Sequence, residues 1–181
     1  MDTQEYNRKL VNMAALAGDI MMRSGAETHR VEDTLSRILG MARSAYAEAL
    51  VLTTGLVVTL SDGEHEPLSI TKRITGDAQN LGRVWAVNSV SRSFCAGNTD
   101  IDTALARLEE IRTERQYSDF LVSVGLVLSS AFFSILFGGS FLDAAGGLLC
   151  GMMLVFVKMF LGPKINRSFI TTMLCAAGIT I

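Results

Sequence analysis

Apolar residues recur every three or four positions in four stretches of the first 115 residues, and this spacing predicts helices. The predicted helices cover residues 6–22, 24–43, 77–95 and 101–115. Ser24 and Glu27 have the spacing of a capping box, so we expect Ser24 to begin the second helix. Asp77 is expected to begin the third helix, and Asn98-Thr99-Asp100 supplies a cap for the fourth. In the third helix Leu81, Val84, Trp85 and Asn88 are expected to share one face.

Between the second and third helices the pattern changes to β-branched and aliphatic runs separated by turn residues. Residues 48–60 contain Thr53-Thr54-Gly55 near their centre, which predicts a β-hairpin. A third strand is predicted at residues 68–74, and its Lys72-Arg73 end is typical of an edge strand. The order helix, helix, three strands, helix, helix predicts an α+β fold with a small antiparallel sheet.

The pattern changes again near Asp119, because charged residues become rare beyond it. Residues 120–137 hold no charge over eighteen positions, which is about the minimum for a membrane span. We therefore expect a cytoplasmic α+β domain at residues 1–117, followed by a transmembrane region at residues 118–181. The predicted spans cover residues 118–138, 141–161 and 168–181. The last of them is too short to cross a bilayer, so the chain is expected to be a truncated piece of a longer protein.

The position of basic residues predicts an orientation for these spans. Arg107, Arg112 and Arg115 precede the first predicted span, and Lys158, Lys164 and Arg167 follow the apolar run of the second, which ends at Val157. The short loop at residues 138–140 carries neither Lys nor Arg. By the positive-inside rule, the N-terminal domain and the second loop are cytoplasmic. The expected location is the inner cell membrane, with several spans and a cytoplasmic N-terminus.

Composition excludes several other classes of function. The first 119 residues mix thirteen basic with seventeen acidic residues and show no basic stripe, so no nucleic-acid partner is expected. The acidic, polar N-terminus is unlike a signal peptide. No nucleophile, phosphate-binding or dinucleotide motif occurs, and neither His29 nor His65 lies among enough ligands for a metal. We therefore expect no enzyme activity, no cofactor and no metal.

Asp143 is an unusual residue because it lies in or beside the second predicted span. An ionisable side chain inside a bilayer costs roughly 2.5 kcal/mol or more, so it marks a candidate substrate or proton pathway. The alternative is that Asp143 caps the second span after Gly138-Gly139-Ser140 at the outer rim. Gly146, Gly147 and Gly151 follow it at a spacing that favours close helix packing.

A second candidate site lies in the N-terminal region. Asn88, Ser91 and Arg92 continue along the third predicted helix, and Arg73 ends the third strand. These polar residues interrupt an apolar face and would suit a small polar ligand. The alternative is a structural one, in which Asn88 is hydrogen-bonded to a sheet edge or loop and Arg92 pairs with an acid.

Several segments of this chain form a pattern with a known parallel. They are Ser24-Gly25-Ala26-Glu27-Thr28-His29-Arg30-Val31-Glu32-Asp33-Thr34, Thr54-Gly55, Arg73-Ile74, Asn80-Leu81, Val87-Asn88, Ser91-Arg92 and Leu136-Phe137-Gly138-Gly139. Together these segments resemble the N-terminal half of the threonine/serine exporter family. The most specific motif residues are Ser24, Gly25, Glu27, Thr28, Arg30 and Glu32. Order and spacing agree across nearly the whole chain.

The resemblance implies a function that composition alone does not give. Members of this family pair a cytoplasmic region with about five spans, and about five more come from the same or a partner chain. The family is implicated in proton-driven export of threonine and serine, and some two-component relatives in dicarboxylate export. The implied partners are the lipid bilayer, the remaining transmembrane half, a small-molecule substrate and further subunits of a homo- or hetero-oligomer. A different class stays open, namely a membrane-anchored cytoplasmic sensor or ligand-binding module.

Overall fold

The computed structural model of this protein describes residues 2–42, 46–75, 79–114 and 117–161. The chain forms two compact units, Met1–Gln116 and Tyr117–Ile181.

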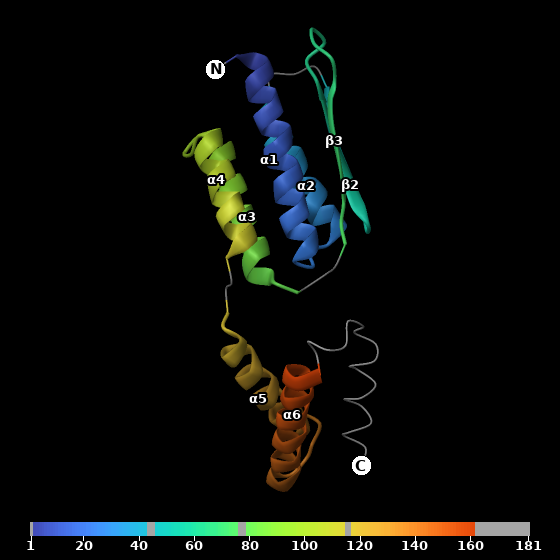
Figure 1. The fold of residues 1–181 in the computed structure, drawn as a ribbon, viewed down its shortest axis with the longest axis vertical. Helices are drawn as coiled ribbons and strands as arrows, with labels where there is room; N and C mark the ends of the chain where they lie inside the picture. The colour runs from blue at the N-terminus through green and yellow to red at the C-terminus, as the bar shows by residue number, and fades with distance from the viewer. Residues whose placement is uncertain (1, 43–45, 76–78, 115–116, 162–181) are drawn as a thin grey trace. The chain divides into compact units, whose positions relative to one another are not determined.

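The first unit contains four helices and three strands among its described residues (Figure 1). In chain order they are α1 (Thr3–Arg23), α2 (Thr28–Leu39), β1 (Tyr46–Leu52), β2 (Gly55–Ser61), β3 (Leu68–Arg73), α3 (Leu81–Cys95) and α4 (Ile101–Thr113). This order confirms the predicted sequence of elements and the α+β fold of the N-terminal region.

The sheet is antiparallel with the order β1-β2-β3, as the sequence predicts. Leu52 pairs with Gly55, so Thr53 and Thr54 form the tight turn of the first hairpin. Alternate residues of β2 point into the core, which is the period expected of a strand buried on one face. Strand β3 lies at an edge of the sheet, which confirms the prediction made from its basic end.

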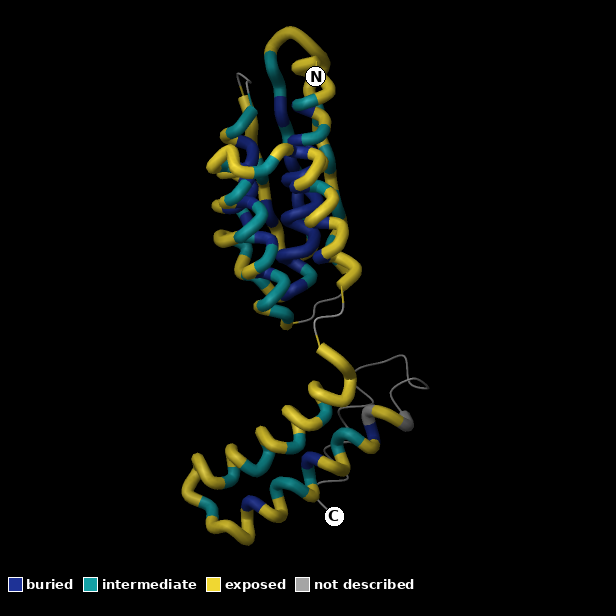
Figure 2. The backbone as a smooth tube through the Cα atoms, turned by 90° about the vertical axis from the view of Figure 1, so that its left-hand side faces the viewer, coloured by how far each residue is buried: buried dark blue, intermediate teal, exposed yellow. Residues whose placement is uncertain are grey.

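The helices form two layers beside the sheet, with α1 and α2 in the middle and α3 and α4 outside them (Figure 1). Helix α1 is the centre of this arrangement, because it packs against β2, β3, α2, α3 and α4. Thirteen of its 21 residues are buried, so its hydrophobic surface extends almost all round. Figure 2 shows the buried segments gathered along the interior of this unit.

Two details of the predicted helices are wrong, and a third falls outside the described residues. Ser24 does not begin α2; it closes α1, and Glu27 stands at the N-cap of α2. The described part of α3 begins at Leu81 after Asn80, whereas the predicted start, Asp77, lies outside the described residues. Leu81 and Trp85 are exposed, because α3 turns Val84 and Val87 toward the core in their place.

The second unit contains α5 (Asp119–Leu136) and α6 (Phe141–Leu161) among its described residues. The two helices pack side by side and run antiparallel, since Gly151 lies near Val127 while Gly147 lies near Ala131. Within the described residues, α5 is the one helix long and apolar enough to cross a membrane. Residues Phe141–Val157 of α6 form a shorter apolar stretch.

Candidate functional site

The motif that begins at Ser24 is a helix stop that joins α1 to α2. The Ala26 N–H donates to the Met21 carbonyl at 3.0 Å, and the Gly25 N–H donates to the Met22 carbonyl at 3.1 Å. This pair of bonds is a Schellman motif, which needs a residue in the left-handed region. Gly25 supplies it with φ of +79°, a conformation that costs other residues roughly 1 kcal/mol or more.

The same junction is tied to the start of α3 and the end of α4. The Asn80 N–H donates to the Ser24 carbonyl at 2.9 Å, and the Asn80 side chain accepts from the Arg83 N–H at 3.0 Å. The Arg83 Nη2 donates to the Glu114 carbonyl at 2.7 Å. These bonds gather one end of all four helices of the first unit, which we call the Ser24 end.

A buried acid strengthens the Ser24 end from within α1. Asp19 is 6 % exposed, and its Oδ1 accepts from the Arg23 Nε at 2.7 Å. Arg23 also donates through Nη1 to the Thr75 carbonyl at 2.8 Å, beyond the end of β3. Sequence reasoning missed this bridge, although the i, i+4 spacing of Asp19 and Arg23 on a helix is its signal.

The motif residues of α2 have different roles. The Glu32 Oε1 accepts from the Val51 N–H at 3.1 Å, so this carboxylate binds the outer edge of β1. Thr28 is half-buried, whereas Glu27 and Arg30 are exposed. The Arg30 carbonyl accepts from the Thr34 hydroxyl at 2.9 Å.

The polar face of α3 forms a structural contact at Asn88. Its Oδ1 accepts from the Thr34 hydroxyl at 3.0 Å, and its Nδ2 donates to the Val84 carbonyl at 3.0 Å. Asn88 therefore joins α3 to α2, and both ends of its amide have partners, as a half-buried polar group requires. Ser91 is buried further along the same helix.

The remaining members of this candidate set do not converge. Arg92 and Arg73 are exposed, one on α3 and the other on β3. Among the described residues, Arg92 makes no ion pair, so the expected pairing with an acid is not found there. The described residues therefore do not bring Arg73 together with Asn88, Ser91 and Arg92.

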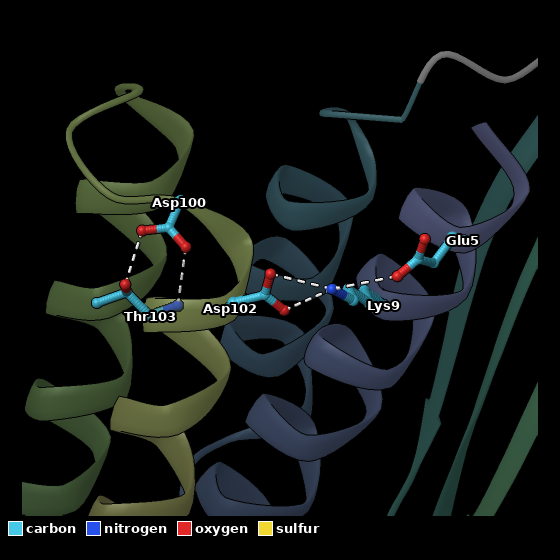
Figure 3. Close-up of polar contacts among 5 residues, drawn as sticks. All are labelled: Glu5, Lys9, Asp100, Asp102 and Thr103. Carbon is cyan, nitrogen blue, oxygen red and sulfur yellow. Dashed lines mark hydrogen bonds and ion pairs between the residues drawn. The ribbon is translucent and has the colours of Figure 1, made fainter. Parts of the chain in front are cut away.

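The opposite end of the first unit holds an ion pair that sequence reasoning did not find, together with the predicted cap of α4. Lys9 of α1 lies between Glu5 and Asp102, with 2.7 Å from its Nζ to the Asp102 Oδ1 (Figure 3). The hydrogen bond to Asp102 raises the pKa of Lys9. Asp100 caps α4 by accepting from the Thr103 N–H and hydroxyl, and the hydroxyl bond lowers the pKa of Asp100.

Asp62 organises the loop between β2 and β3 at that end. Its carboxylate accepts from the backbone N–H groups of His65, at 2.9 Å, and Glu64, at 3.1 Å. It also accepts from the buried Asn7 of α1 at 3.3 Å. The His65 N–H is the main cause that lowers the pKa of Asp62 to about 2. This contact set anchors the hairpin loop to α1.

In the second unit, Asp143 forms a reciprocal cap at the start of α6. Its Oδ2 accepts from the Ser140 N–H at 2.7 Å and from the Ser140 hydroxyl at 2.8 Å. The Asp143 N–H donates back to the Ser140 Oγ at 3.3 Å. This is a capping box, with Asp in the place where Glu or Gln is commoner. The carboxylate is nevertheless exposed within this unit, so the cap leaves it accessible.

The contact between α5 and α6 depends on two of the three glycines singled out in the sequence. A Cβ on Gly147 would lie 2.7 Å from the Ser134 Oγ and 2.8 Å from the Ser130 carbonyl oxygen. One on Gly151 would lie 2.8 Å from the Val127 Cα. A Cβ on Gly146 would meet nothing within 4 Å. Close packing is thus confirmed at Gly147 and Gly151, as in small-residue interfaces of membrane helices.

A groove of about 590 Å³ opens between the start of α5 and the end of α6. Its lining is mainly apolar, with one acid and one hydroxyl near the N-terminus of α5. The lining residues are Asp119, Phe120, Val122, Ser123, Leu126, Val155 and Met159.

The two units define a protein in which an α+β unit is joined to a glycine-packed helical hairpin that exposes apolar side chains. Residues 12–181 match the family model described as "ThrE: Putative threonine/serine exporter". The chain therefore belongs to this transporter family, as its resemblance in sequence predicts, and the family implies a place in a membrane. No curated protein and no solved structure matches the chain.

Proposed function

We propose that this chain is part of a secondary transporter that exports small polar metabolites, with threonine and serine as substrates and protons as the coupling ion. The observation that carries the proposal is the family match over residues 12–181, which covers both units in one module. The glycine-packed hairpin of α5 and α6 supports it, because Gly147 and Gly151 allow the close approach typical of membrane helices. The chain acts as a transporter and not as an enzyme.

In this proposal the first unit is cytoplasmic, and α5, α6 and residues 168–181 belong to the membrane region. The remaining spans come from the same chain or a partner, and several subunits assemble in the inner membrane. The basic residues before α5 and after α6 support this orientation, since positive loops stay in the cytoplasm.

The orientation can be tested with reporter fusions. A reporter that is active only outside the cytoplasmic membrane should be active when fused after Ser140 and silent when fused after Arg115. A reporter active only in the cytoplasm gives the matched control and should show the reverse pattern. Activity on the same side for both fusions would reject a spanning α5.

Asp143 is the acid of α5 and α6 that we propose to line the substrate or proton pathway, with its cap holding the carboxylate in place. Asp143→Asn is a clean test, because the asparagine amide oxygen can still accept from the Ser140 N–H but the side chain cannot take up or release a proton. Threonine efflux from preloaded cells should fall by about tenfold and lose its pH dependence, since the protonatable group is gone.

The assay needs the complete transporter, including the partner half, and equal amounts of protein in the membrane. Efflux near the wild-type rate in Asp143→Asn would reject the pathway role and leave only the cap. Efflux of a dicarboxylate in place of threonine would keep the transporter and change its substrate. If neither compound is exported but binding of a ligand changes the conformation of the first unit, the result would favour a membrane-anchored sensor.

A further inference from the structure

The Ser24 end of the first unit exposes two large apolar side chains on one helix face. Leu81 is 72 % exposed and Trp85 is 68 % exposed, and their i, i+4 spacing places them on the same side of α3. Neither side chain belongs to the core. The residues that α3 contributes to the core include Val84 and Val87. A tryptophan and a leucine exposed together to water are unfavourable, since removing their apolar surface from water would lower the free energy.

The chain leaves the first unit at this same place. The Arg83 guanidinium, in the first turn of α3, holds the Glu114 carbonyl just after the end of α4. Leu81 and Trp85 flank Arg83 in the sequence of α3, so they belong to the same end of the unit as the end of α4. Five residues, 114–118, separate the last residue of α4 from the first residue of α5.

A connection of this length restricts how far the Ser24 end can be from a bilayer that contains α5. Even fully extended, five residues reach only about 20 Å. The polar headgroup region is itself several ångströms deep, and it is the layer in which tryptophan rings gather. The exposed Tyr117 in the connection has the same preference. Arg30 at the start of α2 adds an exposed cation at this end that suits lipid phosphate.

We propose that Leu81 and Trp85 form a lipid-contact surface that inserts into the interfacial layer of the bilayer and holds the Ser24 end there. This inference relies on the proposed insertion of α5. The contact gives the first unit a second attachment besides the connecting chain, so its motif junction is held at the membrane face. The occupant of the surface is the boundary between lipid headgroups and acyl chains, and not another protein.

The chain carries its own probe for this contact, because Trp85 is the one tryptophan among its 181 residues. The 181-residue chain is reconstituted into lipid vesicles that carry a quencher either at the headgroup or near the end of the acyl chains. The headgroup quencher should lower Trp85 emission by about twofold, and the deep quencher should act more weakly. Aqueous iodide should quench less when the same chain is in vesicles than when it is unfolded in urea.

Two variants make the readout specific. Leu81→Ser should weaken quenching by the headgroup label, because it removes the apolar side chain that lies next to Trp85 on the proposed surface. Tyr46→Ser is the matched control, since Tyr46 is also exposed, at 52 %, but pairs with Ser61 near the loop at the opposite end of the unit. It should leave Trp85 quenching unchanged.

Flotation of the vesicles after an alkaline wash separates the possible failures. A chain that does not float with the lipid would overturn both the insertion of α5 and this inference. If the chain floats but lipid-borne labels leave Trp85 emission unchanged, the lipid contact alone is rejected. Protection of Trp85 from iodide in that case would identify a protein segment as the occupant.

Discussion

Helices α1 and α5 have similar lengths but opposite surfaces. Helix α1 buries thirteen of its 21 residues among other elements of the first unit. Helix α5 buries none of its 18 residues, although it is far more apolar. The first unit thus places its hydrophobic groups inside, whereas the described part of the second places them outside and packs on small residues.

The difference shows which force holds each unit together. Removal of apolar surface from water can stabilise the first unit, as in soluble domains. If α5 and α6 lie in lipid, as we propose, this force cannot hold them together, because the surroundings there are as apolar as leucine. There the close contact at Gly147 and Gly151 must supply van der Waals attraction. A substitution should therefore act through buried volume in one unit and through backbone approach in the other.

The largest effect is expected from filling the contact between α5 and α6. Gly147→Leu would push a side chain into Ser130 and Ser134, whose contacting atoms include a backbone oxygen that cannot move aside. Threonine efflux should fall by more than about tenfold, with less protein in the membrane. Gly146→Leu is the matched control, because its side chain enters open space within this unit. Equal loss in both variants would contradict the proposed packing.

The next effect tests the core of the first unit. Residues 1–116 should fold when expressed alone, and Leu35→Ala should lower their free energy of unfolding by about 2–5 kcal/mol in urea titrations. Leu35 is fully buried, and its truncation leaves a cavity beside α1. Leu128→Ala on α5, which is 46 % exposed, should leave the amount of membrane-inserted protein nearly unchanged. Random-coil circular dichroism of residues 1–116 would show that this unit needs the membrane helices.

The smallest effect is expected on the stability of the first unit at acidic pH. Asp62 has a folded-state pKa of about 2, below its unfolded value, so it stabilises the first unit above about pH 4. That contribution should fade as the pH falls toward 2, because protonation weakens acceptance from the His65 and Glu64 N–H groups. Asp62→Asn should lower stability at pH 7 and flatten its change between about pH 4 and 2. If Asp62→Asn leaves the dependence of stability on pH unchanged between about pH 4 and 2, the Asp62 carboxylate does not determine the acid stability of the first unit.

Periodicity predicted most of the fold because local pattern and tertiary burial agree in this chain. The strands, the hairpin at Thr53-Thr54 and the cap at Asp100 all follow from neighbours in sequence. The Ser24 cap was wrong for a physical reason. A Ser-Gly pair can end one helix or begin the next. Here Gly25 has a positive φ, which is the conformation that ends α1.

The candidate sites were harder to predict because they depend on distant partners. Asn88 could be recognised as an interruption of an apolar face, but its partner Thr34 lies 54 positions away, on α2. The face of α3 was misjudged at Leu81 and Trp85 because apolar character alone does not say which side meets the core. The two roles weighed for Asp143 both survive, since its capping bonds are local and a pathway needs helices beyond those described.

The bond between Glu32 and the Val51 N–H has a consequence for many copies of this protein in one membrane. Open strand edges invite neighbouring chains to add strands, and confinement to a surface raises the frequency of such encounters. Here a carboxylate already occupies a donor of the exposed β1 edge. A donor that already has a partner is less available to a neighbouring chain, so Glu32, a residue of the most specific family motif, makes strand addition at this edge less favourable.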